Sequence, residues 1–117
     1  MTTDFVLFDD DCPPCRSLAA WGAARAGDSG LRFRSWQDFA AAEGDARPAD
    51  RLRVLADGAM LEGEAAWEHL VARHPSFQQL TWMARRIGLA RPEAETGKAL
   101  MRTGAIVRRL CLRCPRS

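Results

Sequence analysis

Residues 5–15, FVLFDDDCPPC, run from four apolar residues through three aspartates into a pair of cysteines. A short, continuous apolar run is typical of a strand that is buried on both faces. Pro13 and Pro14 predict the first turn of a helix, where a missing N–H group is tolerated. The stretch therefore predicts a buried strand that delivers a C-x-x-C motif to a helix N-terminus, where a reactive thiol pair is expected.

Further along the chain, strand-like and helix-like segments follow one another in a regular order. Residues 31–36 alternate between apolar and polar side chains and predict a second strand, which the preceding helix makes parallel to the first. Asp57 and Gly58 stand between two apolar runs and predict a hairpin turn. The other predicted elements are a short helix at 39–44, hairpin strands at 51–56 and 59–61, and helices at 64–73, 77–87 and about 98–110.

The order β-α-β-α-β-β-α predicts an α/β fold with a mixed sheet. It is typical of a thioredoxin-like three-layer fold, here with extra C-terminal helices. The 117 residues predict one domain with its own core, and residues 76–117 are interpreted as a basic helical extension of it. Nine bases and only two acids follow from Arg85 onward. We expect the four tryptophans and five phenylalanines to fill the core.

The composition also limits the cellular compartment and the kinds of binding partner that we expect. No apolar run approaches the roughly 20 residues that cross a bilayer, and no charged leader precedes an apolar segment. We therefore expect a cytoplasmic protein with no membrane partner. No nucleic-acid recognition motif is present, so the basic region is interpreted as a solvated face or a contact for an acidic protein. His69 and His74 are expected at the surface or as helix caps.

The first cysteine pair predicts thiol chemistry. Cys12 at the helix N-terminus meets unpaired N–H groups and the positive end of the helix dipole, which favour a thiolate. Cys15 lies one turn further along the same face, within reach of a mixed disulfide on Cys12. We therefore expect Cys12 to be the nucleophile and Cys15 the resolving thiol. Pro14 stiffens the loop between them and is a candidate for binding the substrate.

The three aspartates beside the pair are expected to have different roles. Their charges oppose a second negative charge nearby, yet a positioned carboxylate can also accept or donate the proton during exchange. Asp9 is expected, by strand alternation, to point toward the thiols and to be catalytic. Asp11 is either catalytic or a cap for the helix. Asp10 is expected to be a solvated surface charge.

An apolar strand followed by D-x-D-C-x-x-C resembles the opening motif of the DCC family of thiol-disulfide oxidoreductases, also known as a domain of unknown function. The motif residues here are Asp9, Asp11, Cys12 and Cys15, and the likeness extends over residues 31–36, 51–61 and 63–66. It implies a thioredoxin-like fold and disulfide exchange activity. We expect the partner to be a protein or small-molecule disulfide or dithiol, and we expect no cofactor or metal. Asp10 departs from the glycine that is common in the family.

Thioredoxins also carry a cis-proline before the hairpin strand, facing the cysteines. Pro48 lies three residues before Arg51. By this comparison it is a candidate substrate-binding residue in the cis form, and the alternative is an ordinary loop residue.

The second cysteine pair, Cys111 and Cys114, follows the last predicted helix, and three interpretations stay open. The pair could relay electrons to Cys12 and Cys15, could join them in a four-cysteine zinc site, or could have no role. The zinc site defines an alternative function, that of a non-catalytic metal-binding or protein-interaction module. About a hundred residues separate the two pairs, which is more than structural zinc sites usually span.

Overall fold

The first strand, β1 (Asp4–Phe8), is one of the two inner strands of the sheet. This computed structural model describes residues 3–111. β1 pairs in parallel with β2 (Leu31–Ser35) on one side and antiparallel with β3 (Arg53–Ala56) on the other. Val6 faces Phe33 on one neighbour and Val54 on the other, so its side chain lies in the middle of the buried core. The apolar run that opens the chain is thus buried as predicted.

The hairpin is also confirmed. β3 pairs antiparallel with β4 (Ala59–Glu62), which gives a mixed four-stranded sheet in the order β2-β1-β3-β4. Asp57 and Gly58 at the turn both have positive φ, 49° and 78°. A two-residue turn with both residues in the left-handed region matches the twist of the strands that it joins, and this is why an Asp-Gly sequence predicts it.

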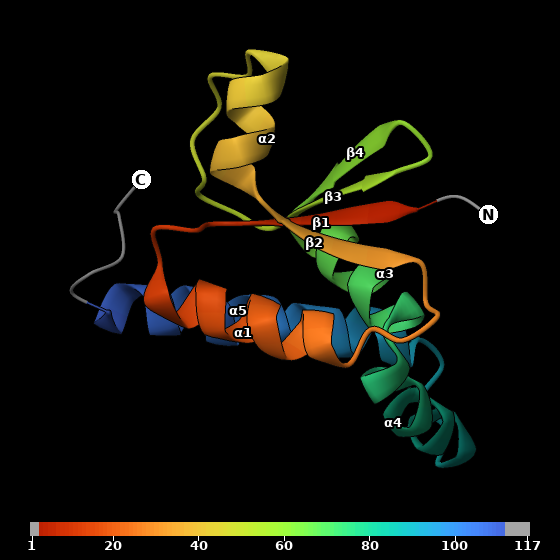
Figure 1. Ribbon diagram of the computed structural model, residues 1–117. Helices are drawn as coiled ribbons and strands as arrows, with labels where there is room; N and C mark the ends of the chain where they lie inside the picture. Colours follow the sequence, from red (N-terminus) through yellow and green to blue (C-terminus); the bar gives the residue numbers. More distant parts are fainter. Residues whose placement is uncertain (1–2, 112–117) are drawn as a thin grey trace.

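Five helices complete the described residues: α1 (Pro13–Ala24), α2 (Trp36–Glu43), α3 (Glu64–Arg73), α4 (Pro75–Arg86) and α5 (Pro92–Leu110). α2 lies on one side of the sheet, and α1 and α3 lie on the other (Figure 1). Val6, Leu31, Val54, Ala66 and Leu70 form the buried cluster between the sheet and this second helical layer. No helix within residues 3–111 has the length and apolar character to cross a membrane.

Three helix starts differ from the prediction. α2 begins at Trp36 because Ser35 accepts a hydrogen bond from the Asp38 N–H and so ends the strand with a helix cap. α4 begins at Pro75 rather than at residue 77. α5 begins at Pro92 rather than near residue 98, so residues 92–97, which precede the predicted helix, are also helical. Proline at the first helical position is the local signal for both of these earlier starts.

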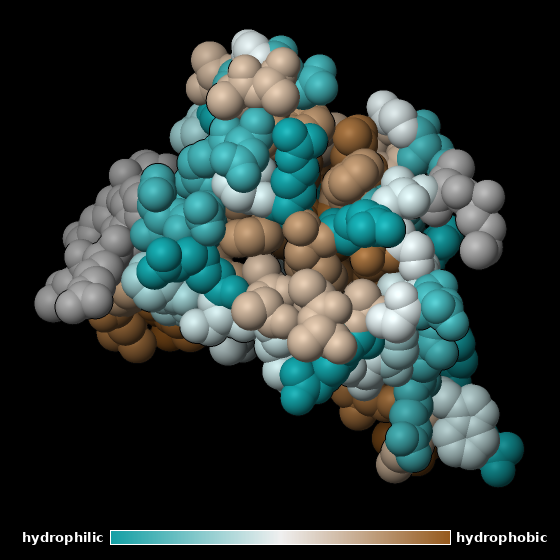
Figure 2. Space-filling model, viewed as in Figure 1, coloured by the Kyte–Doolittle hydropathy of each residue, from teal (hydrophilic) through white to brown (hydrophobic). Residues whose placement is uncertain are grey.

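The aromatic residues do not all fill the core. The side chain of Trp36 is buried, at 2% exposure, and Trp67 is half-buried against the core, but Trp82 is 57% exposed on α4. Leu80, Met83 and Ile87 are also exposed on or just after this helix. Figure 2 shows hydrophobic side chains along the lower edge of the molecule, over α4 and α5. The expectation for the tryptophans is therefore wrong in part.

His74 lies inside the molecule, with 1% of its surface exposed. Its Nδ1 accepts a hydrogen bond from the Ser76 N–H and caps α4, as predicted. Its Nε2 donates to the Gly22 carbonyl of α1 at 2.9 Å, and its ring stacks on Trp21. The expected surface position is wrong for His74 because this ring joins two helices.

α5 packs closely on α3 through a glycine. A Cβ atom added at Gly97 would lie 3.0 Å from the Glu68 backbone nitrogen and 3.2 Å from the Trp67 carbonyl carbon. At Gly104, two turns further along, the nearest atom would be a Trp67 ring carbon at 3.9 Å. The two helices therefore touch backbone to backbone at Gly97 and separate toward Gly104.

We predict opposite effects of one methyl group at these two glycines. Gly97→Ala should lower the free energy of unfolding by roughly 1–3 kcal/mol, because a backbone contact cannot move aside as a side chain can. Gly104→Ala has room and should raise it by roughly 0.5–1 kcal/mol through helix propensity. Urea unfolding measures both. Equal effects of the two substitutions would contradict the close contact between α3 and α5.

Candidate thiol site

The first cysteine pair lies where β1 ends and α1 begins. Cys12 is the N-cap residue of α1, and its carbonyl accepts the first helical hydrogen bond, from the Arg16 N–H at 3.0 Å. Pro13 and Pro14 occupy the first helical turn, as predicted. The side chain of Cys12 is fully buried, whereas Cys15 is half-buried. The helix end and the spacing thus follow the motif, but the motif does not reveal that Cys12 is hidden.

The thiol of Cys15 is hydrogen-bonded to the neighbouring Cys12 side chain and has a raised pKa. Burial raises the pKa of Cys15, and a hydrogen bond with the Cys12 side chain raises it further, to about 12. Cys15 therefore keeps its proton at neutral pH and donates it toward the sulfur of Cys12. Negative charge on Cys12 and on Asp9 acts in the same direction, and the Arg108 cation lowers the pKa of Cys15.

Asp9 is the carboxylate that lies beside the thiols. Its side chain is 3% exposed. Oδ1 accepts hydrogen bonds from the Asp11 N–H at 3.0 Å and from Nε2 of Gln37 at 2.8 Å. Oδ2 lies 3.1 Å from Nη2 of Arg108, which is on α5. The predicted inward direction of Asp9 is confirmed, and the partners that hold it come from α2 and α5.

The other two aspartates are exposed. Asp11 makes no side-chain cap to α1, so the capping interpretation is wrong; its Oδ2 instead accepts from Gln37 Nε2 at 3.3 Å. Asp10 carries a solvated side chain as predicted, and its N–H donates to Oε1 of Gln37 at 2.9 Å. A single glutamine on α2 therefore contacts all three residues of the acidic turn.

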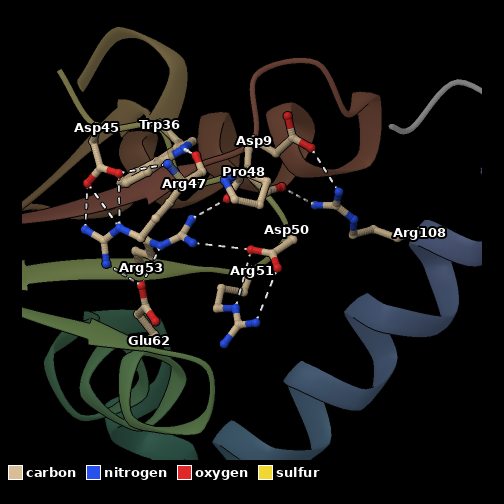
Figure 3. A network of polar contacts seen from close by, with 11 residues as sticks. Asp9, Trp36, Asp45, Arg47, Pro48, Asp50, Arg51, Arg53, Glu62 and Arg108 are labelled. Carbon is tan, nitrogen blue, oxygen red and sulfur yellow. Dashed lines mark hydrogen bonds and ion pairs between the residues drawn. The ribbon is translucent and has the colours of Figure 1, made fainter. Parts of the chain in front are cut away.

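Gln37 and Arg108 are site residues that the sequence interpretation missed. Gln37 lies in a short helix with no motif around it, and Arg108 is one of many bases near the C-terminus. Arg108 is half-buried; besides its contact with Asp9, its Nη1 donates to the Ala49 carbonyl at 3.2 Å (Figure 3). α5 thereby bridges the acidic turn and the loop that precedes β3.

That loop contains Pro48, and a buried arginine holds it in place (Figure 3). Arg53 is 2% exposed and lies 4.2 Å above the Trp36 ring. Its guanidinium donates to the Pro48 carbonyl at 2.9 Å and to Glu62 at 2.8 Å. Every peptide bond within the described residues is trans, so the cis-proline interpretation of Pro48 is wrong, and its exposed side chain is that of a loop residue.

A cavity of about 420 Å³ lies next to the pair. Of the predicted site residues, Asp9, Pro14 and Cys15 line it, whereas Cys12 and Pro48 do not. Arg108 lines it as well, and residues of α1, α3 and α5 supply most of its apolar wall. The structure thus brings the Cys15 thiol, the Asp9 carboxylate and the Arg108 cation to the edge of an apolar space.

The second cysteine pair is described only in part. Cys111 is the C-cap residue of α5, and Cys114 lies outside the described residues. Within residues 3–111 no group of three or more histidine, cysteine and acidic side chains has an arrangement that could hold a metal ion. The relay, the four-cysteine zinc site and the absence of a role therefore remain predictions for this pair.

The raised pKa of Cys15 predicts a loss of stability in alkali. Folded Cys15 holds its proton up to about pH 12, whereas the unfolded thiol releases it near 9.0. The stabilisation is complete below pH 9 and is lost as pH rises from there toward 12. Wild type should lose about 1 kcal/mol more than Cys15→Ser between about pH 9 and pH 10. Urea unfolding under reducing conditions measures the difference, and parallel curves would contradict it.

Comparison with models of known protein families, with curated proteins and with solved structures gives no match for this chain.

Proposed function

We propose that this protein is a thiol-disulfide oxidoreductase in which Cys12 and Cys15 alternate between dithiol and disulfide. The observation that carries the proposal is the contact between a cysteine at the N-terminus of α1 and a second cysteine whose pKa is raised to about 12. The helix end favours negative charge on Cys12. The hydrogen bond from Cys15 also favours negative charge on the Cys12 sulfur. In this proposal Cys12 therefore attacks the substrate disulfide first, and Cys15 attacks second.

The exchange proceeds in two balanced steps. The thiolate of Cys12 attacks one sulfur of a disulfide substrate, the S–S bond breaks, and the departing sulfur takes up a proton. Cys15 then loses its proton and attacks the sulfur of Cys12, which forms the Cys12–Cys15 disulfide and releases the second thiol. The substrate gains two electrons, and the pair loses two. Because Cys12 is fully buried, side chains around it must move aside before a substrate sulfur reaches it.

Asp9 is the proposed acceptor of the proton that Cys15 loses. It lines the same cavity as Cys15, and its charge contributes to the raised pKa of that thiol. The Arg108 cation, 3.1 Å from Oδ2, and the hydrogen bonds from Gln37 and the Asp11 N–H hold the Asp9 carboxylate in this position. The Asp11 side chain is exposed, so Asp11 is the weaker candidate for accepting this proton.

We further propose a thioredoxin-like fold and membership of the DCC family. The sheet order β2-β1-β3-β4, with β1 and β2 parallel and β3 antiparallel, supports the fold. Helices on both faces of the sheet support it too (Figure 1). The family proposal rests on the D-x-D-C-x-x-C motif at residues 9–15, which follows a buried strand as that motif requires.

We predict distinct outcomes for the two cysteines in reduction of insulin disulfides by dithiothreitol. Wild type should accelerate the reaction, and Cys12→Ser should abolish the acceleration because the attacking sulfur is lost. Cys15→Ser, reduced and then mixed with insulin after the dithiothreitol has been removed, should accumulate a mixed disulfide on Cys12, seen by intact mass. Wild type that is no faster than Cys12→Ser would remove the proposed activity.

We predict that the two aspartates separate in the same assay. Asp9→Asn should lower the rate by roughly 100-fold and flatten its rise with pH, because no carboxylate remains to take the proton from Cys15. Asp11→Asn is the matched control at the exposed position and should stay within about twofold of wild type. Equal losses in both variants would assign a general electrostatic role to the turn. Unfolding curves check that Asp9→Asn is folded at the assay temperature.

A further inference from the structure

The cavity beside the thiol pair exposes only one of the two sulfurs. Cys15 lines it and Cys12 does not. We propose that the cavity receives a small, uncharged, apolar thiol, and that this thiol exchanges electrons with the pair through Cys15. The inference rests on the proposed function, and it names a second reactant, distinct from the disulfide that Cys12 attacks.

The wall of the cavity is apolar. Phe33 of β2 and Trp67 of α3 contribute aromatic rings, and Leu18, Leu100 and Val107 contribute aliphatic side chains from α1 and α5. Its volume of about 420 Å³ falls in the range of roughly 300–1,000 Å³ that is usual for small-molecule sites. A peptide segment would place backbone N–H and C=O groups against this wall without hydrogen-bond partners, which is costly. The space therefore favours a small molecule over a protein disulfide.

The charges at the cavity are compensated. Two acids and two bases line it, and each acid forms an ion pair with one of the bases: Asp9 with Arg108, and Asp50 with Arg51. A charged ligand would have to displace one of these partners or leave water without a new counter-ion. An uncharged ligand meets neither cost, and the thiol of Cys15 is the reactive group that it would approach.

The small molecule enters as a neutral thiol and passes its proton to the Asp9 carboxylate, which lines the same cavity. Its sulfur attacks the sulfur of Cys15 in the oxidised pair, the Cys12–Cys15 bond breaks, and Cys12 leaves as a thiolate. The helix N-terminus stabilises that leaving group. A second molecule of the thiol attacks the sulfur of the first, the small-molecule disulfide departs, and the sulfur of Cys15 takes up a proton. Two thiols are oxidised to one disulfide, and the pair is reduced by two electrons.

The test forms the same mixed disulfide on Cys15 from the reduced Cys15 thiol and a small-molecule disulfide. The Cys12→Ser variant is treated with dibenzyl disulfide or with bis(2-hydroxyethyl) disulfide, whose leaving thiols are similar alkyl thiols. Modification of Cys15 is followed by intact mass and peptide mapping. Each rate is divided by that of an unstructured cysteine peptide. We expect the apolar reagent to be favoured by at least tenfold, because its ring is removed from water in the cavity.

Gly104 supplies the matched variant. It lines the cavity, and the nearest atom to an added Cβ is the Trp67 ring at 3.9 Å, so a leucine side chain at this position would enter the free space. In the Cys12→Ser background, Gly104→Leu should bring the ratio of the two normalised rates, apolar reagent over polar reagent, close to one. A melting temperature no lower than that of the parent variant shows that the fold is intact.

Two results would overturn the inference: equal normalised rates for the two reagents, or a preference that Gly104→Leu leaves unchanged. Neither result would contradict the proposed function, which is measured separately as insulin reduction by wild type. Conversely, a wild type that is inactive on insulin, together with a Cys12→Ser variant that keeps a preference sensitive to Gly104→Leu, would refute the proposed exchange. It would leave the cavity as an apolar site with a reactive thiol.

Discussion

A single buried carboxylate, that of Asp9, fixes the arrangement of the thiol site. A charge that leaves water is costly unless hydrogen bonds and an opposite charge replace its hydration. Asp9 obtains these from three elements: the Asp11 N–H in its own turn, Gln37 on α2, and Arg108 on α5. β1, α2 and α5 must therefore all be in place before the turn that leads to Cys12 takes its shape. Loss of any one partner leaves part of a buried charge without compensation.

The order of the elements could be predicted because each has a local cause. An apolar run, an Asp-Gly turn and a pair of prolines each act over a few residues, and all three elements occur where the sequence places them. The errors occur where two local signals compete. Trp36 continues the alternation of β2, yet the Ser35 side chain caps a helix at that point. Pro92 looks like a helix breaker, but in the first turn it begins α5.

The candidate site could be predicted only where it is local in the sequence. Cys12, Cys15 and Asp9 belong to one motif, and alternation along β1 gives the direction of Asp9. Gln37 and Arg108 reach the site through the packing of α2 and α5, and neither residue differs in the sequence from the polar residues around it. The burial of Cys12 and the cavity next to Cys15 depend on the same long-range packing. For this reason the motif predicts thiol chemistry but not which thiol a small molecule can reach.

The contact between Asp9 and Arg108 also sets an order of events during synthesis. The cysteine pair leaves the ribosome long before α5 has been made, so for most of translation Asp9 has no cation beside it and the cavity lacks one wall. Domains gain their full packing only when their last elements have emerged. Until α5 docks, the charge of Asp9 beside the two cysteines is compensated only by its hydrogen bonds to Asp11 and Gln37.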